Sequence, residues 1–314
     1  MAAQTKKNLK KLLYVIISLV VAELIVLSAI LLKDKTFAVL EPAGTIASQQ
    51  KDLMIFAAIL SLFVIMPVFV LLFFILWRFR DGNVKAKYRP NWDGSRKLET
   101  IWWGIPILII LVLATVTWKT SHSLDPYRSL KSDTKPLTVQ VIALQWKWLF
   151  IYPEQNIATV NYLKIPEDTP VNFEITSDAP MNSFWIPQLG GQVYAMSGMQ
   201  TELHLMADHP GQFTGSSANI SGEGFSGMTF NVDAVGKGDF SEWVETVWQS
   251  PDQLTKDTYA TLAKPTKNDP IMLFGSRDPN LYESVIMKYM HAPAKPTEST
   301  TSLPDHTNME GMDH

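Results

Sequence analysis

The sequence contains no cysteine among its 314 residues. This absence excludes disulfide bonds, thiolate metal ligands, catalytic thiols and a lipidated N-terminal cysteine. The chain has no excess of basic residues either, because it contains 27 lysines and arginines and 30 aspartates and glutamates, which gives a net charge of −3. The chain therefore has no electrostatic footprint for nucleic acid.

Catalytic and phosphate-binding motifs are also missing. The six histidines are scattered without metal-ligand spacing, and no Ser-His-Asp set or pair of carboxylates stands out. Gly190-Gly191 and Gly222-x-Gly224 do not open a helix after a strand, as a phosphate-binding loop requires. His204 and His209 flank a predicted strand end and a turn, where we expect both on the surface.

Long apolar runs are what the chain does have, and they lie in its first 118 residues. Residues 53–77 carry no charge and include Pro67, and residues 101–118 include Pro106. About 20 apolar residues span a bilayer, and neighbouring helices in a membrane protein tolerate a proline kink. The two runs predict a transmembrane helical hairpin.

The loop between the two runs is basic, with Arg78, Arg80, Lys85, Lys87, Arg89, Arg96 and Lys97. Basic loops stay in the cytoplasm, so the chain after the second span is expected outside, in the periplasm of a Gram-negative cell.

A third apolar stretch, residues 12–32, follows four N-terminal lysines and is interrupted by Glu23. Its length favours insertion despite one acid, and the lack of a small-residue cleavage site favours an uncleaved helix over a removed signal. Cleavage stays open, and either outcome leaves the later domain outside.

The remainder resembles a soluble domain. Residues 137–141 alternate as L-T-V-Q-V, and similar pieces at 171–175, 203–205 and 230–232 are separated by turn residues. Such short strands indicate an antiparallel Greek-key sandwich. Two amphipathic helices are predicted at 239–248 and 281–290, followed by a polar tail that we expect to be disordered. The predicted divisions are 1–38 (basic N-terminus with signal or anchor helix), 39–120 (hairpin), 121–236 (exported sandwich), 237–291 (helical extension) and 292–314 (tail).

Five positions in the exported domain have a distinctive spacing. Asn182 is followed by Ser217, Ser221, Phe225 and Met228 within F-T-G-S-S-A-N-I-S-G-E-G-F-S-G-M. The spacing resembles the His…Cys-x3-Cys-x3-His-x2-Met pattern of the dinuclear copper centre in subunit II of cytochrome c oxidase. An amide, two hydroxyls and a phenyl ring replace the soft ligands such a centre needs, so we expect no metal here.

Local sequence similarity extends the resemblance over most of the chain, from about residue 40 to 290. It includes A-L-Q-W-K-W-L-F-I-Y-P-E-Q and M-N-S-F-W-I-P-Q-L-G-G-Q-V-Y-A-M-S-G-M. The chain resembles subunit II of the haem–copper oxidases, and specifically of the bo-type ubiquinol oxidases. The resemblance implies a cupredoxin-like sandwich, in agreement with the predicted strands.

The resemblance also gives two residues outside these five positions a counterpart in the family. Asn219 stands where the family has a copper-binding glutamate, and Trp146 where cytochrome c oxidases receive electrons. Without a metal below it, Trp146 is expected to be a packing aromatic.

Glu99 in K-L-E-T-I-W-W resembles the acid at the mouth of a proton-uptake path. The alternative is a carboxylate stabilised by the helix dipole at an N-terminus.

By resemblance, the chain is subunit II of a proton-pumping ubiquinol:oxygen oxidoreductase in the bacterial inner membrane. It would bind no cofactor and hold no catalytic residue, whereas subunit I would carry the haems, one copper and the quinol site. Subunits I, III and IV, quinol and membrane lipid are the expected partners. Three alternatives stay open: a copper-containing cytochrome c oxidase subunit II, a menaquinol-type subunit II, and a tethered binding module without an oxidase.

Overall fold

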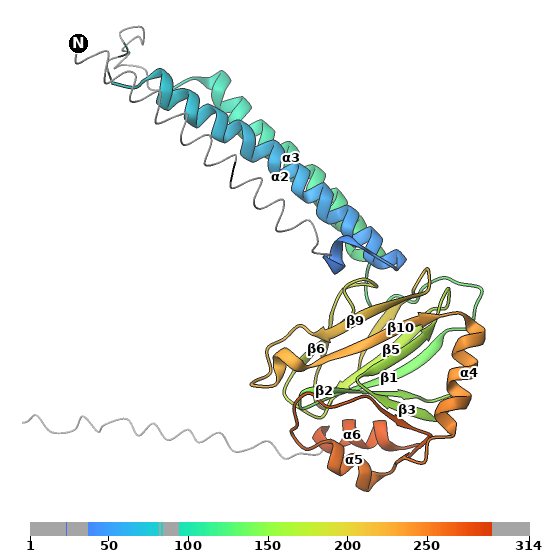
Figure 1. The fold of residues 1–314 in the computed structure, drawn as a ribbon. Helices are drawn as coiled ribbons and strands as arrows, with labels where there is room; N and C mark the ends of the chain where they lie inside the picture. The colour runs from blue at the N-terminus through green and yellow to red at the C-terminus, as the bar shows by residue number, and fades with distance from the viewer. Residues whose placement is uncertain (1–22, 24–36, 82, 84–93, 291–314) are drawn as a thin grey trace, which may run out of the picture.

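The computed structural model describes residues 23, 37–81, 83 and 94–290 of the chain. The predicted N-terminal helix (except Glu23), most of the basic loop and the predicted disordered tail lie outside the described residues. Within them, two long helices lead into a β-sandwich with a C-terminal extension (Figure 1).

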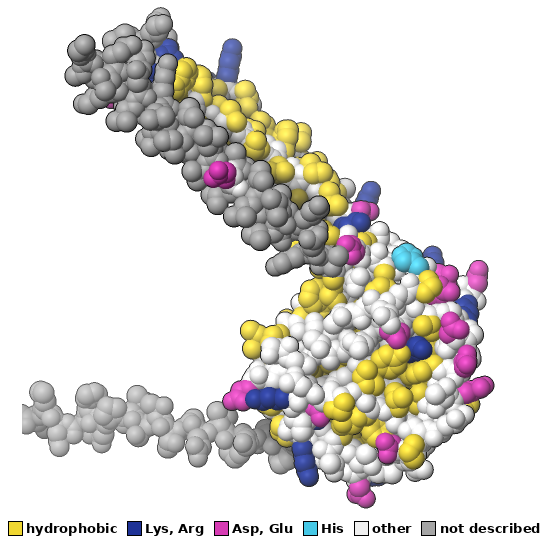
Figure 2. Space-filling view, viewed as in Figure 1, with side chains coloured by type: hydrophobic (Ala, Val, Ile, Leu, Met, Phe, Trp, Pro, Cys, Tyr) yellow, Lys and Arg dark blue, Asp and Glu magenta, His cyan; other side chains and the backbone are white. Residues whose placement is uncertain are grey.

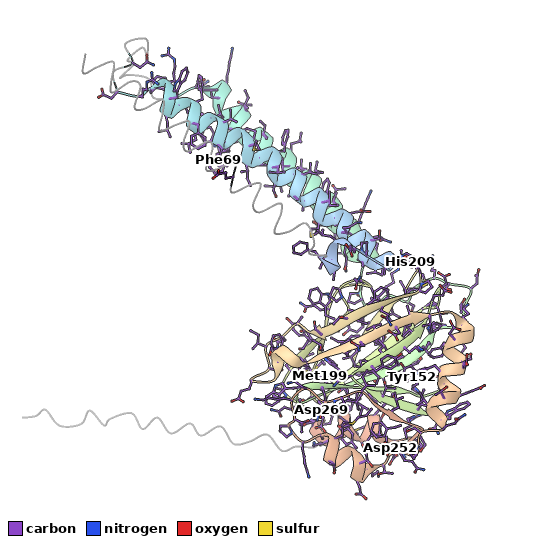
Figure 3. All side chains as sticks on the ribbon, viewed as in Figure 1. Phe69, Tyr152, Met199, His209, Asp252 and Asp269 are labelled. Atoms are coloured by element: carbon purple, nitrogen blue, oxygen red, sulfur yellow. The ribbon has the colours of Figure 1, made fainter. Side chains whose placement is uncertain are left out.

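Both predicted spans are helices. A short 3₁₀ turn, η1 (Ala38–Leu40), precedes α2 (Thr45–Arg78) and α3 (Arg96–Ser123). The two helices are long and apolar enough to cross a membrane. Their apolar side chains are exposed over most of their length, as Phe69 illustrates (Figure 3) and as the yellow surface in Figure 2 shows. Such surfaces require lipid or another protein around them.

The sandwich consists of two sheets. The six-stranded sheet has the order β12-β3-β2-β1-β5-β8, with bounds Met272–Phe274, Ile157–Val160, Lys147–Tyr152, Leu137–Leu144, Val171–Ser177 and Thr201–Leu205. The five-stranded sheet has the order β4-β10-β9-β6-β7, with bounds Tyr162–Pro166, Thr229–Val235, Gly211–Ser217, Asn182–Trp185 and Val193–Ala195.

Strand direction differs from the antiparallel expectation in two places. The pairs β1–β5 and β4–β10 are parallel, whereas the other pairs within the two sheets are antiparallel. Alternating polarity marks one buried face of a strand but carries no information on its partner's direction. The predicted sandwich is confirmed, and its purely antiparallel pairing is wrong.

Aromatic rings fill the space between the sheets. Phe184 of β6 and Phe230 of β10 stack with ring centroids 5.3 Å apart, and Trp148 and Phe150 of β2 approach both from the other sheet. All four side chains are essentially inaccessible to solvent. These contacts hold β6 and β10, which flank the candidate site, against the six-stranded sheet.

The C-terminal extension contains α4 (Lys237–Trp248), β11 (Gln253–Leu254), α5 (Lys256–Leu262), β13 (Ser276–Arg277) and α6 (Leu281–Met290). Helix α4 packs against the core between the sheets, at the edge formed by β3 and β4, whereas α5 and α6 cover the outer face of the six-stranded sheet. The helices predicted at 239–248 and 281–290 are therefore confirmed. Because α5 and α6 pack on Ile142, Leu149 and Ile151, strands β1 and β2 are buried on both faces.

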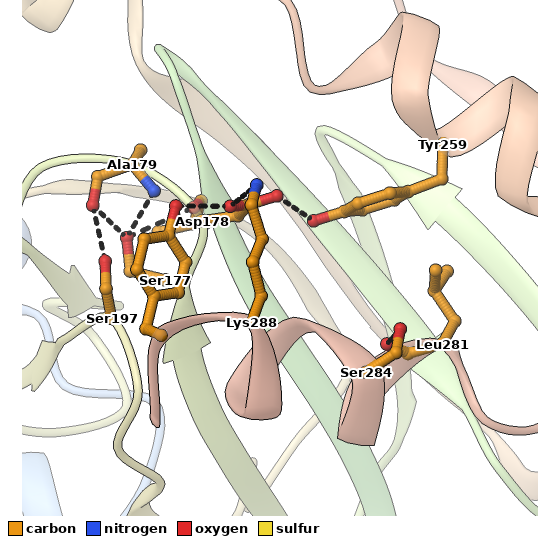
Figure 4. A network of polar contacts seen from close by, with 10 residues as sticks. Ser177, Asp178, Ala179, Ser197, Tyr259, Leu281, Ser284 and Lys288 are labelled. Atoms are coloured by element: carbon orange, nitrogen blue, oxygen red, sulfur yellow. Dashed lines mark hydrogen bonds and ion pairs between the residues drawn. The ribbon is translucent and has the colours of Figure 1, made fainter. Parts of the chain in front are cut away.

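A buried carboxylate fixes this extension in place (Figure 4). Asp178 follows β5, and its side chain accepts hydrogen bonds from Tyr259, Tyr289 and Lys288. The Lys288 contact is a 2.6 Å ion pair, although the lysine itself is half exposed. Burial and the hydrogen bond to Asp178 raise the pKa of Tyr259, so its hydroxyl stays protonated as a donor.

The start of α2 is joined tightly to the sandwich. Ala43 donates to the Gln188 carbonyl at 2.7 Å, and Thr45 donates to the Asp208 carboxylate at 2.9 Å. Gly44 leaves no room for a side chain, since a Cβ would lie 2.4 Å from the Met206 carbonyl. The membrane helices are therefore attached through a packed junction.

Of the two histidines near this junction, His209 is exposed as predicted (Figure 3). His204 is 7% exposed, and its Nδ1 bonds the Pro126 carbonyl at 2.9 Å. The surface prediction for His204 is wrong, because the segment after α3 returns across β8.

Candidate functional site

The candidate site lies at one end of the five-stranded sheet. Asn182 begins β6, Ser217 ends β9, and the loop from residue 218 to 228 returns through the turn η2 (Phe225–Gly227) to β10. The Ser217 amide donates to the Met228 carbonyl at 3.1 Å, and the Asn219 side chain donates to the Met181 carbonyl at 2.8 Å. The positions predicted from spacing thus come from β6, from β9 and from the loop after β9, and the pairing of β6 with β9 brings them together.

A neutral amide–hydroxyl pair forms the centre of this cluster. The Ser217 hydroxyl lies 3.0 Å from Asn182 Oδ1 and 3.2 Å from the Asn219 carbonyl, so its one proton is shared between two acceptors. Asn182 Nδ2 donates to the Pro180 carbonyl at 2.7 Å. Asn182 and Ser217 are 1% and 6% exposed, so these bonds compensate the loss of water.

The atoms in the cluster do not fit a thiolate-bridged copper pair. They are amide and hydroxyl oxygens, the ring of Phe225, and the Met228 thioether, which is buried in the core. Within the described residues there is no group of three or more His, Cys, Asp or Glu able to hold a metal ion. Thiolate and imidazole are the ligands that copper prefers, and a single thioether is weak.

Ser221 differs from the rest of the cluster. Its hydroxyl is buried without a hydrogen-bond partner among the described residues, whereas its carbonyl accepts from Trp146 Nε1 at 3.2 Å. The contact of this loop with Trp146 therefore runs through the backbone and does not depend on the serine side chain.

Trp146 occupies the turn between β1 and β2 with a left-handed φ of 68°. Its indole packs against the core, and the loop from residue 221 to 225 lies on its ring. A Cβ on Gly224 would come within 2.3 Å of the ring, so only glycine permits this approach. Trp146 thus packs as expected, but at a hairpin turn and not within a strand.

A segment that the sequence did not indicate covers Trp146. Lys267 Nζ lies 5.5 Å from the indole centroid and forms a 2.7 Å ion pair with Glu223. The hydrogen bond and charge of Lys267 lower the pKa of Glu223. Residues 264–269, called the cover below, thus bring the side chain of Lys267 over the indole.

This cover is anchored by a buried cation. Lys147 follows Trp146 and has a side chain only 1% exposed; its Nζ lies 3.3 Å from Asp269 (labelled in Figure 3). The same ammonium donates to the Lys264 carbonyl at 3.2 Å and to Thr266 Oγ1. A lysine inside an otherwise aromatic stretch is the one sequence signal for this anchor, because a buried lysine requires a partner.

Glu99 lies far from this cluster, in the first turn of α3. It is exposed, and its Oε1 would lie 3.3 Å from a Cβ on Gly94, so the carboxylate lies beside the start of the helix. Ser95 makes no side-chain cap, and Glu99 is the acid in the first turn of the helix. This position is compatible with a role in proton uptake and with a capping role.

Three family models match successive parts of the chain. The model for the transmembrane domain of cytochrome c oxidase subunit II matches residues 34–120, and that for its periplasmic domain matches residues 154–235. A third model, the COX aromatic-rich motif, matches residues 249–292, which include the cover over Trp146.

Curated relatives are similar over most of their length. Cytochrome bo(3) ubiquinol oxidase subunit 2 of Pseudomonas putida is 49% identical over 263 residues, covering 84% of this chain and 84% of the relative. The protein of the same name from Pseudomonas aeruginosa is 47% identical, covering 84% and 80%. Ubiquinol oxidase subunit 2 of Acetobacter aceti is 48% identical, covering 83% and 86%.

Proposed function

Because this chain belongs to the family of ubiquinol oxidase subunit 2, we propose that it is the membrane-anchored, non-catalytic second subunit of a proton-pumping quinol oxidase. The complex oxidises ubiquinol, reduces oxygen to water and resides in the bacterial inner membrane. Subunit I holds the haems, one copper and the quinol site, and subunits III and IV complete the assembly. This chain itself binds no cofactor.

The observation that carries this proposal is the buried pair of Asn182 and Ser217. A copper relay at this position would require soft ligands, whereas the two side chains bond each other and the backbone. Quinol is an electron donor dissolved in the membrane, so its electrons do not need to pass through the exported domain. Loss of the relay is therefore compatible with a quinol oxidase.

The surface above the cluster supports the same proposal. In a cytochrome c oxidase, Trp146 would have to be approached by a protein electron donor. Here Lys267 lies over the partly buried indole and pairs with Glu223, so a cation occupies part of the surface at which such a donor would bind. This cation and the unsuitable donor atoms disfavour a copper-containing cytochrome c oxidase subunit.

The exposed apolar helices support assembly with subunit I. The most apolar stretches of α2 and α3 are not buried within the chain. A hairpin with so much apolar surface can pack against another membrane subunit while the attached sandwich covers that subunit's outer face.

Glu99 is proposed to collect protons at the cytoplasmic boundary and pass them to subunit I. An exposed carboxylate at the start of a membrane helix can exchange protons with water, and ionisable groups at such positions often line ion pathways. The basic residues Arg96 and Lys97 beside it keep it on the cytoplasmic side.

Ubiquinol is preferred over menaquinol as the substrate. Three relatives named for ubiquinol are 47 to 49% identical to this chain and two more are 42% identical, whereas quinol oxidase subunit 2 of Bacillus cereus is 42% identical over 233 residues. Oxygen uptake by the purified complex, measured in turn with ubiquinol, menaquinol and reduced cytochrome c, tests this assignment. We expect rapid uptake with ubiquinol; rapid uptake with cytochrome c would contradict the proposal.

A further inference from the structure

A cavity of about 460 Å³ lies where the membrane helices meet the sandwich. It is bounded by the first two turns of α2, by the segment from residue 123 to 131 after α3, and by the end of β8. Figure 2 shows basic and acidic side chains gathered at this junction, next to the apolar surface of the helices. The cavity belongs neither to the former copper position nor to the expected proton path.

The length of α3 places this cavity at the level of lipid headgroups. Its 28 residues span about 42 Å at 1.5 Å per residue, compared with a bilayer of about 40 to 45 Å including headgroups. Trp118 and Tyr127, 71% and 53% exposed, lie on either side of the helix end. Exposed aromatic rings are enriched at this depth in membrane proteins.

The cavity carries two cations without a carboxylate partner. Among the described residues, neither Arg128 nor Lys131 forms an ion pair. Arg128 uses Nη1 to bond the His122 carbonyl at 3.2 Å, which orients the guanidinium and leaves most of its five N–H donors for a ligand. The acid lining the cavity, Asp125, accepts from the Tyr127 amide at 3.0 Å.

The remaining lining adds neutral hydrogen-bonding groups. Gln49, Gln50 and Gln192 line the cavity. His204 forms its wall, and because Nδ1 bonds a carbonyl, that nitrogen carries the proton. Two cations and several amide groups suit a phosphate group, two oxygens of which arginine can bind in a bidentate manner.

We propose that this cavity binds the headgroup phosphate of an anionic phospholipid from the outer leaflet. Arg128 and Lys131 neutralise the phosphodiester, and the glutamine amides bond its oxygens or the glycerol hydroxyls beyond it. The bound lipid fills the space between the hairpin and the sandwich. The proposal depends on the membrane position of the helices and not on the identity of the quinol.

The test uses the purified complex in nanodiscs of phosphatidylcholine with a minor fraction of phosphatidylglycerol. After exchange into detergent, mass spectrometry of the intact complex counts the retained phosphatidylglycerol. The double variant R128Q/K131Q should retain it roughly 25-fold less tightly, from about a factor of five for each basic side chain at a membrane surface. The matched control K237Q/K256Q removes two exposed lysines far from the cavity and should behave as the wild type.

Equal retention by R128Q/K131Q and the wild type would overturn the proposal. Displacement of the lipid by excess inorganic phosphate, but not by chloride of equal ionic strength, would assign the site to free phosphate and also overturn it. A photoreactive phosphatidylglycerol analogue tests the wild type without a substitution. Crosslinks within residues 45–50 or 123–131 support the site, and crosslinks confined to other segments contradict it.

Discussion

Asp269 is the acidic partner of a buried lysine, and its substitution is expected to destabilise the cover over Trp146. The side chain of Lys147 is 1% exposed and that of Asp269 is 13% exposed, with a separation of 3.3 Å. In D269N the ammonium loses its counter-charge but stays enclosed by the Lys264 carbonyl and Thr266. The charge then has no way to regain its hydration without movement of residues 264–269.

The size of the effect follows from that enclosure. Breaking a buried pair by removing one partner costs about 3 to 5 kcal/mol, because it leaves an uncompensated charge. An asparagine retains part of the hydrogen bonding, so we expect about 3 kcal/mol. For a domain of this size, this change lowers Tm by about 6 to 12 °C.

Thermal unfolding of the purified full chain in detergent, followed by near-ultraviolet circular dichroism, measures this loss. The control D252N removes an exposed carboxylate from the same extension and should change stability by no more than about 0.5 kcal/mol. In a double-mutant cycle, K147M/D269N should recover much of the loss, since no unpaired charge is left buried. Additive effects of K147M and D269N would refute the reasoning.

Three further predictions concern the loop, the acid at the membrane boundary and the surface ion pair. The variant G224A places a methyl group against the Trp146 ring and should lower the free energy of unfolding by about 1 to 3 kcal/mol, as measured by thermal unfolding. The control G238A adds a methyl group in open space on a helix and should leave stability unchanged or raise it. E99Q should slow steady-state oxygen uptake and proton pumping together if the acid collects protons; unchanged turnover would leave only a capping role. The lysine partner of Glu223 lowers its pKa, so the ion pair is fully present above pH 4.5 and is lost as the pH falls through the lower pKa of the folded state. Quenching of Trp146 fluorescence, measured as wild type minus W146F, should increase only in that acidic range. The variant E223Q should show the increase at neutral pH.

The helices and strands of this fold could be predicted from the sequence better than the pairing of the strands. Residues 53–77 and 101–118 lie within α2 and α3, and both helices extend further because their polar ends carry no hydropathy signal. The predicted strands are present, yet the parallel pairing of β1 with β5 depends on a crossover that alternation does not report.

The candidate site was predicted in part. Spacing located Asn182 and Ser217, and their side chains do meet, because residues of adjacent strands in a sheet are close in space. The cover formed by Lys267 was not predicted, since this contact with Trp146 joins residues far apart in the chain and no local pattern marks it. The burial of His204 escaped prediction for the same reason.

Electron paramagnetic resonance and near-infrared absorption of the purified full chain, incubated with copper and then washed, test the central claim most directly. The account predicts no mixed-valence copper signal, because the cluster at the ends of β6 and β9 holds an amide–hydroxyl pair in place of soft ligands. Detection of a coupled copper pair bound at this cluster would contradict it.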